Sequence, residues 1–317
     1  MSETMIRIKH LENPNITTFV RGKQINIRNH EALVSIDDAK AMMSGPYGYE
    51  LIGVYDNFIE YVNKIHVTVE TLKQGAPDNC VMVGIPLAES KMYAWPLFTE
   101  ALLAIKGREK LHIFFTLDET SAQWTQQIFE WAKNNVDKFY NISILTWSAD
   151  TEMAWNRVFK ITVARQLIFN FARTIESITH VWFIDADNII PAHALENLSR
   201  VNVEASAGLY RFKAVVAGGP VVFDQLGEKN WPPTCLGQQR VEVKPDMGLV
   251  KCDWTGAGCL MLSRRIFMKY NFDWSKWIQR NGEDAWICLC AQKETGEQLV
   301  VDTSVNCGHL DDRGEIW

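Results

Sequence analysis

HVWFIDADNIIP, residues 180–191, is an apolar run that ends on two carboxylates, Asp185 and Asp187, just before a turn-prone Asn and a Pro. An apolar run of this length predicts a strand buried on both faces of a sheet. Side chains alternate along a strand, so Asp185 and Asp187 point to the same side while Ala186 points away. Two carboxylates this close repel one another, and a divalent cation that prefers oxygen ligands, Mg²⁺ or Mn²⁺, removes the conflict. The alternative is that one aspartate caps the following turn and the other is solvated.

Strand and helix patterns alternate upstream of this run, with apolar strands at 80–86, 111–117 and 142–147 and helices at 94–105, 121–135 and 158–175. This alternation predicts an α/β domain, Rossmann-like, with a mostly parallel central sheet and helices on both faces. In such sheets, ligands bind outside the carboxyl ends of the strands. A site is therefore expected where these strand ends meet: GIPLAES (84–90), FTLDET (115–120), TWSAD (146–150) and IDADN (184–188).

The residues ahead of this domain follow a different pattern. Short strand signals separated by turns occupy residues 5–54, and residues 57–74 predict a connecting helix. The turn GAPDN (75–79) then marks a boundary. We expect a small β-rich module with its connecting segment at 1–75 and the main domain at 76–317. The module is expected to bind an oligomer mate or another partner, or to pack as a small cap on the main sheet.

Composition and charge narrow the class of protein. The net charge of −6 argues against a generic polyanion binder, because such binding needs clustered Lys and Arg. No stretch of about 18 apolar residues occurs and the first residues lack the apolar core of a signal peptide, which predicts a cytoplasmic protein with no integral membrane segment. The seven cysteines lack paired CxxC spacing and mostly lie in apolar runs, so we expect buried free thiols.

Further candidate residues lie near the C-terminus. Glu283 and Asp284 precede a helical pattern that stops at Gly296. Carboxylates in this position either cap the helix or leave one member facing a cleft as a general base. His309 follows a strand pattern and is either a metal ligand or a structural histidine. Residues 227–247, with a Trp, a Pro pair and a Gly, predict either a mobile loop or a structural hairpin.

A set of motifs, in order along residues 79–310, resembles those of nucleotide-sugar-dependent glycosyltransferases of the GT-A fold, family 2 above all. They are VGIP (83–86), ARQLIFNFA (164–172), VWFIDADNIIP (181–191), TGAGCLMLSRRIF (255–267), GEDAWICLCAQKETG (282–296) and VDTSVNCGH (301–309). The resemblance implies a GT-A catalytic domain at 76–317. It also makes Asp185 and Asp187 the DxD pair, with His309 completing a metal site for Mn²⁺ or Mg²⁺.

The resemblance further implies roles for individual residues. Asp284 would deprotonate the acceptor, with Glu283 beside it. An acid commonly reads the base at the position of Asp118, and a basic residue contacts base or phosphate at that of Arg165. The nucleotide-sugar site would contain Pro86, Leu87, Asp118, Arg165, Asp185 and Ala186, and the acceptor-side loop Trp254, Thr255 and Gly256.

These roles describe a glycosyltransferase of EC class 2.4, a hexosyl- or pentosyltransferase. It would move a sugar from a nucleoside-diphosphate sugar, UDP favoured over GDP, to a hydroxyl of a glycan, a protein or a modified nucleic-acid base, with inversion favoured over retention. One alternative is a nucleotidyltransferase that makes sugar nucleotides, but IPLAES (85–90) lacks the Gly and Arg typical of its first loop. The other is an inactive, transferase-like binding or assembly protein, against which the full set of carboxylates argues.

Overall fold

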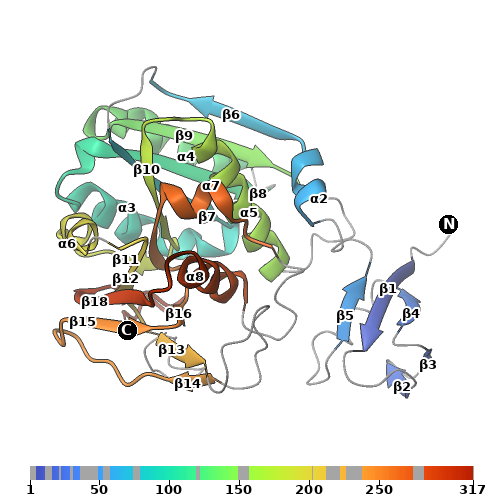
Figure 1. The fold of residues 1–317 in the computed structure, drawn as a ribbon. Coiled ribbons are helices and arrows are strands. Elements are labelled where there is room, and N and C mark those ends of the chain that lie inside the picture. The colour runs from blue at the N-terminus through green and yellow to red at the C-terminus, as the bar shows by residue number, and fades with distance from the viewer. Residues whose placement is uncertain are drawn as a thin grey trace.

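The computed structural model describes residues 5–10, 16–20, 23–28, 31–35, 49–52, 58–73, 79–118, 122–148, 157–201, 203–211, 222–225, 238–273 and 282–316. Its centre is a nine-stranded sheet in the order β15-β18-β12-β17-β10-β7-β8-β9-β6 (Figure 1). These strands are β6 (Val67–Thr71), β7 (Cys80–Leu87), β8 (Leu111–Asp118), β9 (Asn141–Trp147), β10 (Ile178–Ile184), β12 (Ala205–Leu209), β15 (Leu249–Cys252), β17 (Cys259–Ser263) and β18 (Leu299–Asn306).

Most strands of this sheet run in one direction. β10, β7, β8 and β9 pair in parallel, as do β12 and β18, whereas β17, β15 and β6 pair antiparallel with their neighbours. Among the described strands of this sheet, β6, β15 and β17 are therefore the ones that run against the rest. The predicted α/β class with a mostly parallel central sheet is confirmed.

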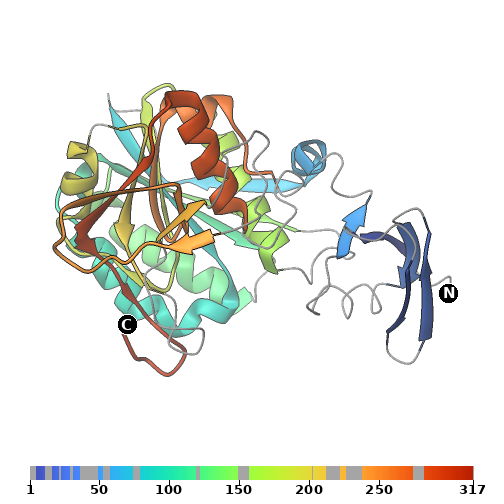
Figure 2. The same ribbon diagram turned by 60° about the horizontal axis from the view of Figure 1, so that its bottom comes forward.

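Helices cover both faces of the sheet (Figures 1 and 2). Along β7, Cys80 and Met82 join one apolar cluster while Val81, Val83 and Ile85 join the other, as the alternation of a strand requires. The first cluster contains residues of α2 (Phe58–Lys64), α5 (Arg157–Arg173), α7 (Arg264–Lys269) and α8 (Gly282–Thr295). The second contains residues of α3 (Trp95–Ala104), α4 (Ala122–Asn135) and α6 (Ala194–Arg200). Single 3-10 turns connect some elements: η1 (Glu89–Ala94), η2 (Arg108–Lys110) and η3 (Val136–Lys138).

The elements described between residues 5 and 52 are strands, and Figure 1 shows them to one side of the large sheet, beyond α2. β1 (Met5–His10), β4 (Glu31–Ser35) and β5 (Tyr49–Ile52) form one sheet, and β2 (Ile16–Val20) and β3 (Lys23–Ile27) form a hairpin. The predicted connecting helix over 57–74 is wrong beyond Lys64. Residues 67–71, rich in β-branched side chains, instead form β6 and pair with β9.

Two small ladders near the C-terminal part complete the fold. β11 (Asn188–Ile189) pairs with β19 (Gly308–His309), so Asn188 lies opposite His309 although the two are far apart in the sequence. β13 (Val222–Gln225) pairs with β14 (Gln238–Arg240) and with β16 (Trp254–Thr255). β13, which precedes the 227–247 region, thus pairs antiparallel with β14, which lies within it. Residues 226–237, between these two strands, lie outside the described residues.

The expectations on the cysteines and on membrane-spanning segments can be compared with the structure. Six cysteines are buried and free, namely Cys80, Cys252, Cys259, Cys288, Cys290 and Cys307, which confirms the expected thiols. Cys235 lies outside the described residues. Within the described ranges, no helix has the length and apolar character needed to cross a membrane.

Candidate active site

A pocket of about 320 Å³ opens at the carboxyl ends of β7, β8, β9 and β10. All four strand ends singled out in the sequence contribute to its wall. The lining residues are Pro86, Leu87, Ala88, Ser90, Lys91, Asp118, Trp147, Lys160, Ile161, Ala164, Asp185, Ala186 and Asp187. The pocket therefore occupies the edge where ligands bind in parallel α/β sheets.

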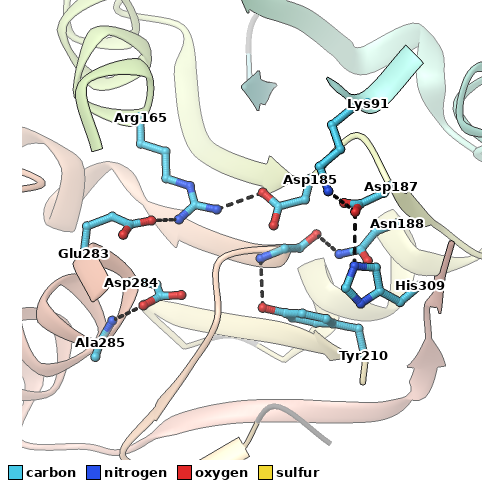
Figure 3. Close-up of polar contacts among 11 residues, drawn as sticks. Lys91, Arg165, Asp185, Asp187, Asn188, Tyr210, Glu283, Asp284, Ala285 and His309 are labelled. Carbon is cyan, nitrogen blue, oxygen red and sulfur yellow. Dashed lines mark hydrogen bonds and ion pairs between the residues drawn. The ribbon is translucent and has the colours of Figure 1, made fainter. Parts of the chain in front are cut away.

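Asp187 is the most constrained acid of this pocket. Its side chain is 2% exposed, and Oδ2 contacts the ammonium of Lys91 and lies 3.2 Å from Nε2 of His309 (Figure 3). The hydroxyl of Tyr93 donates to the same oxygen at 3.2 Å. Burial alone would raise the pKa of Asp187. The contact with His309 and the charge of Lys91 outweigh burial and hold that pKa far below its usual range, so Asp187 is an anion at any physiological pH.

The orientation of His309 suits a cation beside Asp187. Nδ1 lies 2.6 Å from the carbonyl oxygen of Arg211, which only accepts, so Nδ1 carries a proton. In a neutral ring, Nε2 would then present a lone pair to a carboxylate oxygen, which is favourable only with a proton or a metal ion between them. Ligands about 2.1 Å from an octahedral Mg²⁺ or Mn²⁺ and at right angles lie about 3 Å apart. The 3.2 Å separation of Nε2 and Oδ2 fits such a pair of ligands.

Asp185, the other member of the pair, is engaged elsewhere. One of its oxygens accepts from Nη2 of Arg165 at 2.8 Å, and its side chain is 30% exposed. Among the described residues, no group of three or more His, Cys, Asp or Glu side chains is close enough to hold a metal ion. Protein ligation by Asp187 and His309 together is thus the arrangement that these residues offer, and the three-ligand set with Asp185 stays a prediction.

Arg165 joins the two acid pairs of the site. Its guanidinium, 2% exposed, contacts Asp185 on one side and Glu283 on the other (Figure 3). Burial would lower the pKa of Arg165, but the charges of Glu283, Asp185 and Asp284 outweigh it and raise that pKa further, so the residue stays a cation. A buried charge of this kind is stable only when paired. Arg165 thereby neutralises one member of each acid pair and leaves Asp187 and Asp284 as the other members.

Asp284 lies in the first turn of α8, half-buried beside Glu283, which is 4% exposed. Burial, and next the charge of Glu283, raise the pKa of Asp284 to about 7 against the opposing charge of Arg165. Its Oδ1 accepts the backbone N–H of Ala285 at 2.8 Å. A carboxylate with a pKa near the working pH is suited to accept and release a proton. The two remaining acids thus differ, since Asp187 stays an anion while the pKa of Asp284 lies near 7.

The backbone of Gly258 lies close to the Asp185–Asp187 segment and is hydrogen-bonded to it. The carbonyl of Gly258 accepts from the backbone N–H of Asp185 at 3.1 Å and from Nδ2 of Asn188 at 2.8 Å. Its own N–H donates to the hydroxyl of Tyr210 at 3.3 Å. A Cβ at position 258 would lie 2.9 Å from Cζ of Tyr210 and would also collide with the amide of Asn188. Only glycine fits there.

Gly258→Ala is therefore expected to destabilise the protein. Overpacking and the loss of the bonds to Asn188 and Tyr210 should lower the free energy of unfolding by at least about 2 kcal/mol. Chemical denaturation followed by tryptophan fluorescence measures this. An unchanged denaturation midpoint would mean that the loop at 256–258 has room that the structure does not show.

The other predicted residues lie in different places. Pro86, Leu87, Asp118 and Ala186 line the pocket, and Asp118 is paired with Lys160. The acceptor-side candidates Trp254, Thr255 and Gly256 are buried and are not among the lining residues of the pocket. Their role, like that of Arg165 as a contact to base or phosphate, stays a prediction.

Several site residues were missed in the sequence. Lys91 and Tyr93 lie in η1, directly after the GIPLAES strand end, and Lys160 precedes Arg165 by about one and a half helical turns in α5. Trp147 is inside the TWSAD motif but was not singled out. A cation just beyond a strand end that faces two aspartates is the signal that would have identified Lys91.

No protein-family model matches the sequence, and no curated protein matches it. Solved structures that are similar in fold include the mannosyltransferase PcManGT from Pyrobaculum calidifontis in complex with GDP-Man and Mn²⁺, at 15% identity over 77% of this chain and 62% of that chain, with a TM-score of 0.48. S. aureus TarS is 12% identical over 72% of this chain and 59% of that chain, with a TM-score of 0.44. GalNAc-T7 with UDP, GalNAc and Mn²⁺ is 10% identical over 75% of this chain and 45% of that chain, with a TM-score of 0.48. The match spans less than two thirds of each of these three chains. Because these TM-scores are below 0.5, the chemistry rests on the residues of this chain.

Proposed function

We propose that this chain is a metal-dependent glycosyltransferase that moves a sugar from a nucleoside-diphosphate sugar to an acceptor hydroxyl. One observation carries the proposal. Arg165 pairs with Asp185 and Glu283, which leaves a permanently ionised Asp187 beside His309 and an Asp284 whose pKa is raised to about 7. Displacement of a diphosphate by a hydroxyl needs both a place to hold the departing negative charge and a base.

The pocket supplies the donor side of this reaction. Asp187 and His309 would hold Mn²⁺ or Mg²⁺, which when bound acts as a Lewis acid toward the leaving diphosphate. The indole of Trp147 and the Asp118–Lys160 pair line the same pocket and offer a face and polar groups to a nucleobase and its sugar. A UDP-sugar is our preferred donor, with a GDP-sugar as the other choice.

Asp284 supplies the acceptor side. Its ionised carboxylate would take the proton of the acceptor hydroxyl as the oxygen attacks the anomeric carbon, and attack opposite the diphosphate inverts the anomeric configuration. Glu283, held by Arg165, raises the pKa of Asp284 and so adapts it to this task. Trp254, Thr255 and Gly256 are proposed to shape the approach of the acceptor, which is a glycan, a protein or a modified nucleic-acid base.

The proposal extends to the domain, the reaction class and the N-terminal residues. A GT-A type catalytic domain of family 2 character at 76–317, an EC 2.4 activity and a partner-binding role for residues 1–75 are parts of the proposal. The motifs between residues 79 and 310 support the first two. The third is supported by β1–β5, which form sheets separate from the main one, whereas β6 belongs to the main sheet.

A donor panel tests the proposal directly. The protein is incubated with Mn²⁺ and UDP- or GDP-sugars, and release of nucleoside diphosphate is measured with and without each acceptor class. We expect slow hydrolysis of one donor, stimulated by the right acceptor. Formation of pyrophosphate from a nucleoside triphosphate and a sugar phosphate would contradict the proposal and identify the protein as a nucleotidyltransferase. Absence of both nucleotide and metal binding in calorimetry would replace it by a binding or assembly role.

A further inference from the structure

The ammonium of Lys91 contacts Asp187, one of the two residues proposed to hold the cation. Lys91 belongs to η1, and its ammonium contacts Oδ2 of Asp187, the same oxygen that faces Nε2 of His309. Both Lys91 and Asp187 line the pocket at the ends of β7 and β10. The positive charge that the buried carboxylate requires is therefore already supplied by the chain itself.

An ammonium and a divalent cation compete for this oxygen, because both are cations drawn to the same negative charge. Each would approach the carboxylate to within bonding distance, and two cations that close to one another repel strongly. A metal ion that binds Asp187 must therefore first displace Lys91. Removal of the ammonium should accordingly strengthen metal binding, provided that the carboxylate and the histidine keep their positions.

Lys91 is less tightly held than Arg165, the cation that joins the two acid pairs. Its side chain is 19% exposed and reaches the pocket on a flexible stem, whereas Arg165 is 2% exposed and clamped between two carboxylates. The hydrogen bond from the hydroxyl of Tyr93 would hold Asp187 in place when the ammonium departs. Displaced into the pocket, the ammonium would meet a bound anion rather than solvent alone.

We propose that Lys91 is a built-in competitor of the divalent cation at Asp187, which keeps the cation affinity of the empty pocket low and is displaced into the pocket when the cation binds. The purpose of this competition rests on the proposed function, because an incoming diphosphate gives the displaced ammonium a new partner. The cation then enters efficiently only together with its anionic substrate.

Binding of Mn²⁺ without any nucleotide tests the competition. Isothermal titration calorimetry is run on the wild-type protein, Lys91→Met, Lys91→Arg and Lys160→Met. Lys160→Met is the matched control, because Lys160 lines the same pocket but pairs with Asp118. We expect Lys91→Met to bind Mn²⁺ at least tenfold more tightly than the wild type, and the other two variants to stay within about threefold. Equal or weaker binding by Lys91→Met, or an equal gain in Lys160→Met, overturns the proposal.

A second measurement uses the wild-type protein, so that a misfolded variant does not decide the matter. Lysine acylation is followed by mass spectrometry at rising Mn²⁺ concentration. Displacement should raise the labelling rate of Lys91 severalfold and leave Lys160 unchanged, and an unchanged or slower rate at Lys91 overturns the proposal. Both measurements omit the sugar donor. A tighter Lys91→Met complex together with a donor panel that shows no turnover would keep the competition and reject the transferase.

Discussion

Asp284→Asn is expected to lower kcat for glycosyl transfer by about 10²–10⁴-fold, the usual contribution of a general base. The amide cannot accept the hydroxyl proton, yet it keeps the oxygen that accepts the N–H of Ala285. In the wild type, kcat/KM should rise with pH through about 7, because the raised pKa of Asp284 sets the pH at which the base becomes ionised. Initial rates with a saturating donor, measured from pH 5 to pH 9, give both results.

The stability of the same variant provides the control. With a folded pKa of about 7 and an ordinary value of 3.8, Asp284 keeps a proton in the folded state that the unfolded chain has lost, so its contribution to the free energy of unfolding falls as the pH rises between these values. Asp284→Asn should therefore be more stable than the wild type at pH 8 and gain little near pH 4. A variant that is slow because it is unfolded would show the reverse. Full activity in a folded Asp284→Asn protein would remove Asp284 from the chemistry.

Asp187→Asn should abolish Mn²⁺ binding and lower transfer by about 10³-fold or more, since charge stabilisation of the leaving group by a metal is worth several kcal/mol. The amide is nearly isosteric but loses the charge that draws the cation to His309. Calorimetry with Mn²⁺ and donor hydrolysis measure the two effects separately. Asp118→Asn serves as the control, because it lies in the same pocket and pairs with Lys160 rather than with His309. It should alter donor affinity and leave Mn²⁺ binding unchanged. Unaltered turnover in Asp187→Asn would reject the metal assignment.

The main sheet could be predicted from the sequence because its strands are continuous apolar runs. Cys80–Leu87 and Ile178–Ile184 are each buried on both faces, so their pattern depends on local composition alone. The sequence pattern wrongly predicts helix at the edge strand Val67–Thr71, because a strand that is exposed throughout lacks the apolar pattern of a core strand. Hydrophobic periodicity predicts secondary structure from the side chains that a segment buries, so it gives little information on a segment whose side chains are all exposed.

The acids of the candidate site, with His309 and Arg165, could be predicted, but the ion pairs among them and the contacts of Lys91 could not. Asp185, Asp187 and Asp284 stand out at strand and helix ends, and the four strand ends do meet at one pocket. The division of labour between the acids depends on Arg165, whose ion pairs bridge residues 20 and 118 positions away. Contacts of that length are set by packing of α5 against the sheet and α8, so no local spacing encodes them.

The pairing of β11 with β19 has a consequence for the order in which parts of the protein open. Asp187 follows a central strand, whereas His309 is held by a two-residue ladder and by the bond from the N–H of Leu310 to the carbonyl of Asp187 at 2.8 Å. A ladder of two residue pairs is expected to open at a smaller free energy than the central strands of a large sheet. We therefore expect backbone amides around His309, which Arg211 also holds at 2.6 Å, to exchange faster than those of the central strands, so that the two halves of the cation site have different lifetimes.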